Sequence, residues 1–243
     1  MSAPPKTRGD IAVNAACEFG LTTVLLFGVV TTVRWLADPL SPLAIANPRI
    51  LFTVAGLVVA VLIAALMYSP PGRRSGGHMH AGVSVFVWLN GRLPGRAVAP
   101  YVVAQLAGSL VGTALARLVW GPEVARLGYA AVHPRPSLGS DGLVLAETLP
   151  LLVVFAAVTA CLRRPAWMRF VPIVIGVGVG LSIALLASVS GASINPSRQF
   201  GPALLSGVTG ELWIYLLVPI AAPALVALVA RSTPRATSPA PAR

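Results

Sequence analysis

Charged residues are scarce in this chain, at 10% of 243 residues, and acidic residues are the scarcest, with 7 Asp and Glu against 18 Lys and Arg. Hydrophobic residues make up 56% of the chain. Several windows exceed the roughly 18 apolar residues that mark a bilayer-spanning helix. The chain is therefore predicted to be an integral membrane protein that has the lipid bilayer as a partner.

The formal charge of +11 raises the question of a nucleic-acid partner. Nucleic-acid binding calls for basic residues gathered on one soluble face or stripe. In this chain the basic residues lie in short connections between apolar segments. No nucleic-acid partner is expected.

Cysteine is nearly absent. Cys17 and Cys161 both fall inside apolar segments, where a thiol behaves as a small hydrophobe, so no disulfide is expected. The sequence also lacks a cluster of Cys, His or carboxylate ligands, a nucleophile paired with a base, and a phosphate-binding loop. We therefore expect no metal, no cofactor and no enzymatic activity.

Six apolar segments are long enough to cross a bilayer, at residues 11–33, 50–68, 97–120, 142–162, 171–189 and 212–230. Two shorter apolar pieces, 83–89 and 202–205, follow polar loops and are too brief to cross alone. An even number of spans places both ends on one side, and the excess of basic residues in cytoplasmic connections says which. With both termini in the cytoplasm, twelve of the eighteen basic residues lie inside. The predicted location is the plasma membrane.

The order of segments repeats. Two spans, a polar loop with a short apolar piece, and a third span occur twice, at about 10–120 and 142–231, and the first span of each half carries one glutamate, Glu18 or Glu147. Three spans per half is an odd number, so the two halves have opposite orientations. Inverted repeats of this kind place a binding or permeation site near the membrane midplane.

The two polar loops are related in sequence. The second reads SGASINPSR at residues 190–198, and the first reads SGGHMHAGVS at residues 75–84. They resemble the SGxxxNPAR and SGxxxNPA signatures of the major intrinsic proteins, the aquaporin and aquaglyceroporin family. The second loop matches well, whereas the first has His80, Ala81 and Gly82 where the family has Asn-Pro-Ala.

The resemblance covers the whole chain between its tails. It implies an all-α membrane protein with six transmembrane helices and two half-membrane helices in an inverted repeat. Residues 10–231 would form a single channel domain, between a cytoplasmic tail at 1–9 and a disordered cytoplasmic tail at 232–243. The function implied is a passive channel for water and small uncharged solutes such as glycerol, assembled as a homotetramer with one pore per subunit.

The pore centre is predicted at the start of the half-helices. Asn195 suits the N-cap of a helix that has Pro196 in its first turn, and such a helix points its positive dipole end at the midplane. In the family that this chain resembles, two asparagine amides donate hydrogen bonds there to a passing water or polyol, and the dipoles oppose cations. The predicted pore-centre residues are His80, Ala81, Gly82, Asn195, Pro196 and Ser197.

The selectivity filter is carried over from the same resemblance. Arg198 is expected to repel cations at the outer constriction. Spacing to Asn195 places the other members at Ala192 and Ile183, with one on the second span within residues 55–60. None of these is aromatic or histidine, whereas water-strict members usually have a histidine and a bulky ring there. A wide, apolar filter is therefore expected, which favours glycerol or urea alongside water.

Glu18 and Glu147 permit two interpretations. An ionisable group inside a span is a functional hypothesis by default, and with His80 the pair could form the proton relay of a secondary transporter. In the resembling family the matching glutamates brace the backbone of the half-loops. Uptake of solute against its gradient under an imposed pH difference would distinguish a transporter from a channel.

His80 carries the main departure from the family pattern. An imidazole can donate a hydrogen bond to a passing oxygen and can gain a charge near physiological pH. Two converging helix dipoles disfavour that charge, so a neutral ring at pH 7 and a block on acidification are expected. The alternative is a non-conducting structural paralogue in which His80 plugs the pore.

Overall fold

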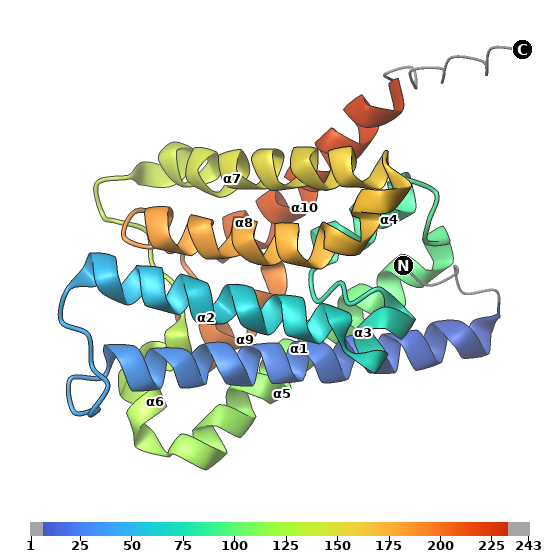
Figure 1. The fold of residues 1–243 in the computed structure, drawn as a ribbon. Helices are drawn as coiled ribbons and strands as arrows, with labels where there is room; N and C mark the ends of the chain where they lie inside the picture. The colour runs from blue at the N-terminus through green and yellow to red at the C-terminus, as the bar shows by residue number, and fades with distance from the viewer. Residues whose placement is uncertain (1–6, 233–243) are drawn as a thin grey trace, which may run out of the picture.

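Six long helices run side by side in the computed structural model, which describes residues 7–232 (Figure 1). They are long and apolar enough to cross a membrane, which confirms the predicted fold class. Their bounds are α1 (Arg8–Ala37), α2 (Pro48–Tyr68), α5 (Gly95–Trp120), α7 (Gly139–Leu162), α8 (Val171–Leu186) and α10 (Leu212–Ser232), and the 3-10 helix η2 (Pro165–Phe170) leads into α8.

Two short helices, α4 (Ala81–Leu89) and α9 (Pro196–Ser206), follow the polar loops. α9 begins directly after its predicted cap residue, Asn195, and α4 begins directly after His80. α9 is longer than the predicted piece at 202–205, because Pro196 already stands in its first turn and because the helix continues to a C-cap glycine, Gly207, with φ 77°.

Three further short helices lie in stretches that were predicted only as connections: α3 (Pro70–Ser75), α6 (Pro122–Arg126) and η1 (Gly128–Ala130). The sequence favours α3, because the Ser69 side chain caps it and two prolines occupy its first turn. A β-carbon on Gly72 would lie 2.1 Å from the carbonyl oxygen of Leu66, so only glycine fits where α3 packs on the end of α2.

The ends of the chain differ slightly from the prediction. α1 starts at Arg8 with a capping box between Thr7 and Asp10, so residues 8 and 9 belong to a helix and not to a tail. Ser232 is the last residue of α10. The rest of the predicted tails, 1–6 and 233–243, lies outside the described residues.

Glycines bring the long helices into close contact. A β-carbon on Gly108 or Gly112 of α5 would lie 2.5 Å or 2.3 Å from a carbonyl oxygen of α1. Gly176 and Gly180 of α8 approach carbonyl oxygens of α2 in the same way. Small residues four apart allow such backbone contact between membrane helices. The result is two tight helix pairs, α1 with α5 and α2 with α8.

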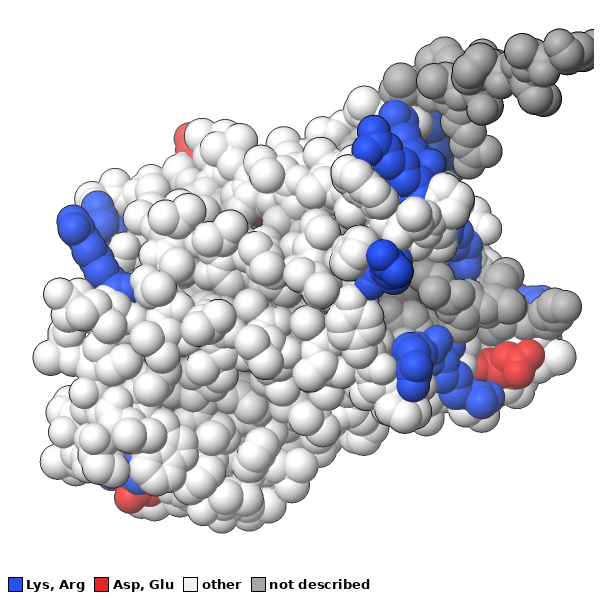
Figure 2. Space-filling model, in the orientation of Figure 1, with Lys and Arg blue, Asp and Glu red and all other residues white. Residues whose placement is uncertain are grey.

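The charged residues on the surface lie mainly at the two ends of the molecule (Figure 2). Figure 2 shows Lys and Arg gathered at the end where Figure 1 places α3 and the last turns of α7 and α10. The broad surface between the two ends is nearly free of charge in this view. Large apolar side chains of the long helices, such as Leu57, Val153 and Leu185, are exposed, at 65%, 71% and 72%. This surface suits contact with lipid chains.

Candidate functional site

The half-helices α4 and α9 meet at their N-terminal ends, and each is capped by the residue before it. The Oδ1 atom of Asn195 accepts a hydrogen bond from the Ser197 amide at 2.9 Å. The Nδ1 atom of His80 accepts hydrogen bonds from the amides of Gly82 at 2.9 Å and Val83 at 3.4 Å. Histidine therefore takes the capping position that asparagine takes in the other half.

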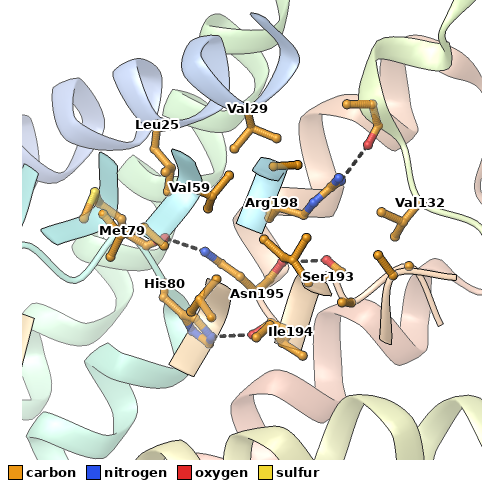
Figure 3. Close-up of a pocket in the computed structure, with 18 of the residues that line it drawn as sticks. Leu25, Val29, Val59, Met79, His80, Val132, Ser193, Ile194, Asn195 and Arg198 are labelled. Carbon is orange, nitrogen blue, oxygen red and sulfur yellow. Dashed lines mark hydrogen bonds between the residues drawn. The ribbon is translucent and has the colours of Figure 1, made fainter. Parts of the chain in front are cut away.

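The two cap residues also join the halves (Figure 3). The Nδ2 atom of Asn195 donates to the carbonyl oxygen of Met79 at 3.0 Å, and the Nε2 atom of His80 lies 2.8 Å from the carbonyl oxygen of Ile194. Each cap thus contacts the carbonyl group that immediately precedes the other cap. The pore centre is a reciprocal junction between residues more than a hundred positions apart.

The hydrogen-bond partners of the two His80 ring nitrogens show which nitrogen carries the hydrogen. Backbone amides can only donate, so Nδ1 is an acceptor and the ring hydrogen is on Nε2, which donates to Ile194. A neutral imidazole has a single N–H group, and this one is engaged. The expectation that His80 donates to a passing oxygen is therefore wrong, because its donor is used in the junction. Asn195 keeps its second amide hydrogen, since only one donor bond from Nδ2 is present.

Glu18 binds the first loop from the core of the protein. Its side chain is fully buried and accepts hydrogen bonds from the amides of His78 at 2.9 Å and Met79 at 2.7 Å. It also accepts from Ser75 Oγ at 2.7 Å and Gln105 Nε2 at 2.9 Å. These contacts satisfy four buried donors.

Glu147 repeats the arrangement in the second half. It is fully buried, accepts from Ser190 Oγ at 2.7 Å and accepts from the Ile194 amide at 2.5 Å. The serine of each Ser-Gly pair thus contacts the glutamate of its own half. Neither Glu18 nor Glu147 lines the central cavity.

Two tyrosines complete the support and were not predicted. Tyr101 on α5 donates to the carbonyl oxygen of Ser75 at 2.9 Å, and Tyr215 on α10 donates to that of Ser190 at 2.5 Å. Both side chains are buried, at 0% and 2% exposed. The available signal was one tyrosine within the third span of each half, in a chain that has only 4 tyrosines.

The residue before each cap has an uncommon backbone conformation. Met79 has φ 49° and Ile194 has φ 41°, in the left-handed region that non-glycine residues rarely adopt. This conformation accompanies the carbonyl bonds that they accept from the opposite half. Their amides are held by Glu18 and Glu147, so the surrounding contacts compensate for the unfavourable backbone.

Arg198 points into the outer part of the cavity, where its Nη1 atom donates to the carbonyl oxygen of Ala130 at 2.7 Å (Figure 3). The neighbouring side chain of Gln199 holds both backbone groups of Val132, at 3.0 and 3.1 Å. The linker at 121–141, which joins two of the predicted spans and contains prolines and both acidic and basic residues, is expected from its composition to be an exposed loop. Part of it is instead buried against α9, with Ala130 and Val132 only 6% and 8% exposed.

A cavity of about 340 Å³ extends along these residues. The predicted filter residues Arg198, Ala192 and Ile183 all line it. α2 contributes Ala55 and Val59 from the predicted range and also Phe52, which lies one turn outside that range. The wall contribution of α2 therefore does include an aromatic ring.

The predicted pore-centre residues divide into two groups. His80 and Asn195 line the cavity, together with Met79, Ser193 and Ile194. Four others do not line it, because they form the first turns of the half-helices behind the caps: Ala81, Gly82, Pro196 and Ser197. The remaining wall is mainly aliphatic, from residues such as Leu25, Val29 and Val154.

Comparison with known proteins agrees with this architecture. The family model "Major intrinsic protein" matches residues 10–230. A probable aquaporin AqpM of Archaeoglobus fulgidus is 37% identical over 180 residues, which cover 72% of this chain and 72% of that protein. Mouse aquaporin-8 is 33% identical over 180 residues, covering 72% of this chain and 67% of its own length.

A solved structure has the same fold. The aquaglyceroporin from Plasmodium falciparum superposes with a TM-score of 0.65, covering 90% of this chain and 93% of its own, at 21% sequence identity. The model match spans nearly the whole chain, and the inverted half-helices, their caps and the bracing glutamates occur in both halves. The chain belongs to the major intrinsic protein family.

Proposed function

We propose that the protein is a passive transmembrane channel for water and small uncharged solutes such as glycerol. The observation that carries the proposal is that the N-terminal caps of α4 and α9 meet in the wall of a mainly aliphatic cavity. The lining combines the Asn195 amide and Arg198 with mainly aliphatic side chains. A polyol has hydroxyl groups on one edge and carbon on the other, and this wall matches both. The names of the relatives, aquaporins and an aquaglyceroporin, support the same class.

We further propose a homotetramer in the plasma membrane with both termini in the cytoplasm. The basic end of the molecule, where α1 begins and α10 ends, supports this orientation because basic connections stay in the cytoplasm (Figures 1 and 2). The tetramer rests on the family resemblance, and the mass of the detergent-solubilised protein tests it.

Two other functions are compatible with the sequence alone. A proton-coupled transporter would need Glu18 and Glu147 to titrate in contact with the permeation path. Both lie outside the cavity lining, and both accept hydrogen bonds from backbone amides that protonation would weaken. A pore plugged by His80 is also disfavoured, because the ring is turned to Ile194 as part of the wall.

Osmotic measurements on liposomes that contain the purified protein test the function. Shrinkage in sucrose reports water flux, and re-swelling in glycerol or urea reports solute flux. We expect both to exceed those of empty liposomes, with no dependence on an imposed pH difference. Water and solute fluxes equal to those of empty liposomes would contradict the proposal.

Arg198→Ala tests the charge barrier. Like charges about 4 Å apart near a protein surface repel by about 4 kcal/mol, so removing this cation should raise cation or proton leak at least tenfold. Neutral solute flux should be retained. Ion flux is read with a pH-sensitive dye in loaded liposomes. Arg135→Ala, an exposed arginine that does not line the cavity, is the matched control.

Ile183→His tests the filter wall. A polar ring in place of an aliphatic side chain removes contact with the carbon edge of a polyol, so glycerol flux should fall severalfold and water flux less. Ile183→Val keeps the wall aliphatic and serves as the control. The other predicted filter residue, Ala192, is less suitable for such a test. Its φ is 47°, which a β-branched residue such as threonine adopts only with strain, so Ala192→Thr would also disturb the loop. Equal loss of both fluxes would place the constriction elsewhere.

His80→Asn tests the junction. Asparagine can keep the cap and the bond to Ile194 and adds a second amide hydrogen, so we expect water and glycerol flux at or above the native level. His80→Leu leaves the Ile194 carbonyl and two amides unpaired and should lose most of its flux. A native protein that never conducts while His80→Asn does would identify His80 as a plug.

The block on acidification expected from the sequence is tested with the same variants. It requires a ring nitrogen that is free to take a proton. A proton on Nδ1 would replace two cap bonds by contacts between donors. We therefore expect native flux at pH 5 to remain close to that at pH 8, and a loss in acid that His80→Asn does not share would restore the switch.

A further inference from the structure

A second hollow lies away from the pore, between the last turns of α7 and α10. It has a volume of about 640 Å³ and shares no residue with the central cavity. Its floor and sides are apolar or small, formed by Leu152, Ala156, Thr159, Ala160, Leu225, Val226, Val229 and Ala230. Both helices are long and apolar enough to span a membrane, so the groove lies at the depth of the bilayer.

Cations stand at one end of the groove only. Arg163 and Arg164 directly follow the last residue of α7, and both line the groove. Arg163 donates to the carbonyl oxygen of Ala230 at 3.3 Å, which draws its guanidinium across to α10. Among residues 7–232, neither arginine pairs with a carboxylate. Their remaining N–H groups are therefore available to an anion.

Trp167 completes this end. Its ring lies under the Arg164 guanidinium, 4.5 Å from ring centre to carbon, and its side chain is 46% exposed. Tryptophan with arginine at the end of a membrane helix marks the level of the lipid headgroups. Figure 2 shows a dense group of basic residues where Figure 1 places the ends of α7 and α10. The groove thus runs from the headgroup level into the hydrocarbon region.

We propose that this groove is a binding site for an anionic phospholipid of the cytoplasmic leaflet. An acyl chain lies in the apolar groove, and the phosphate accepts hydrogen bonds from Arg163 and Arg164. Arginine suits this role because its planar N–H groups can bind two phosphate oxygens together. A zwitterionic lipid fits less well, since its cationic group would meet arginines and no carboxylate. A second copy of this chain also fits less well, because docking through its own basic end would place further arginines beside Arg163 and Arg164.

The site is tested with delipidated protein in detergent, by native mass spectrometry during titration with phosphatidylglycerol or phosphatidylcholine. We expect the native protein to retain phosphatidylglycerol preferentially. Each basic residue near a membrane surface contributes about 1 kcal/mol of attraction to anionic lipid, so Arg163→Gln with Arg164→Gln should weaken retention at least about tenfold. Arg73→Gln with Arg74→Gln removes two cations from the last turn of α3, outside the groove, and should retain the lipid.

A second pair of variants tests the acyl part of the site. Ala160→Trp fills the groove while both arginines remain, and Ala157→Trp adds the same bulk at another exposed position of α7 that does not line the groove. Only Ala160→Trp should lose the lipid. Equal loss in both arginine double variants would show general electrostatic attraction and overturn the site. So would equal retention of the two lipids, or a protein dimer that Ala160→Trp abolishes without any change in lipid binding.

Discussion

Glu18→Ala is expected to leave the first loop without its anchor and to reduce the amount of folded channel severely. Three buried donors lose their acceptor, namely two backbone amides and a glutamine amide, whereas the Ser75 hydroxyl can still donate to the carbonyl oxygen of Pro71 at 3.2 Å. An unpaired buried donor costs roughly 1–3 kcal/mol, so the sum is about 3 kcal/mol or more, against a total stability of about 5–15 kcal/mol for a typical protein. The measurements are the thermal midpoint by size-exclusion chromatography and flux per reconstituted protein.

Two further variants serve as comparisons for the stability of Glu18→Ala. Glu18→Gln keeps one oxygen acceptor but turns an NH₂ group toward other donors, so its stability should lie between that of the native protein and that of Glu18→Ala. Asp141→Ala removes an exposed acid from the first turn of α7 and should change the stability by less than about 1 kcal/mol. A well-folded Glu18→Ala that loses only uptake driven by a pH difference would contradict the bracing role and favour a proton relay.

Gly82→Ala is the second large expected loss, although alanine is the residue that the family signature has at this position. A β-carbon on Gly82 would lie 1.9 Å from the carbonyl oxygen of Pro219 on α10. That carbonyl cannot accept the usual helical bond, because the residue four positions on is Pro223, which has no amide hydrogen. α4 and α10 thus touch through backbone atoms, and neither can yield by a side-chain rotation.

Changing residues 80–82 to the Asn-Pro-Ala of the family signature should therefore destabilise the protein, and the loss should come from Gly82→Ala. Overpacking against backbone costs about 1–3 kcal/mol or more, so Gly82→Ala should lower the thermal midpoint and the yield of folded protein. Ala81→Pro should be tolerated, because Ala81 is the first residue of α4, where proline fits. The triple variant, with His80→Asn added, should behave like Gly82→Ala alone. A triple variant as stable as His80→Asn would contradict this account.

The long elements of the fold could be predicted because their signals are local. Runs of apolar residues gave the six spans, and Asn195 with Pro196 gave the start of α9. The mirrored glutamates and Ser-Gly pairs gave the inverted repeat. Each of these patterns lies within one helix or one loop, so no long-range information was needed.

The details of the site could not be predicted, because they depend on contacts between distant segments. The direction of the His80 ring is set by Ile194, which is 114 positions away. The place of Phe52 on the wall depends on the rotation of α2, which is fixed by its glycine contact with α8. Nothing in the first loop indicates that Pro219 excludes a side chain at Gly82.

The exchange of hydrogen bonds between the two caps has a consequence for how the chain is made. When α1 to α5 have entered the membrane, the carbonyl of Met79 and the N–H of His80 still lack their partners, since Asn195 and Ile194 belong to a segment not yet synthesised. Buried polar groups without partners are costly in hydrocarbon, so the first half waits in an incomplete state. The junction can therefore form only after α9 has been synthesised, which makes its closure a late step in the assembly of the chain.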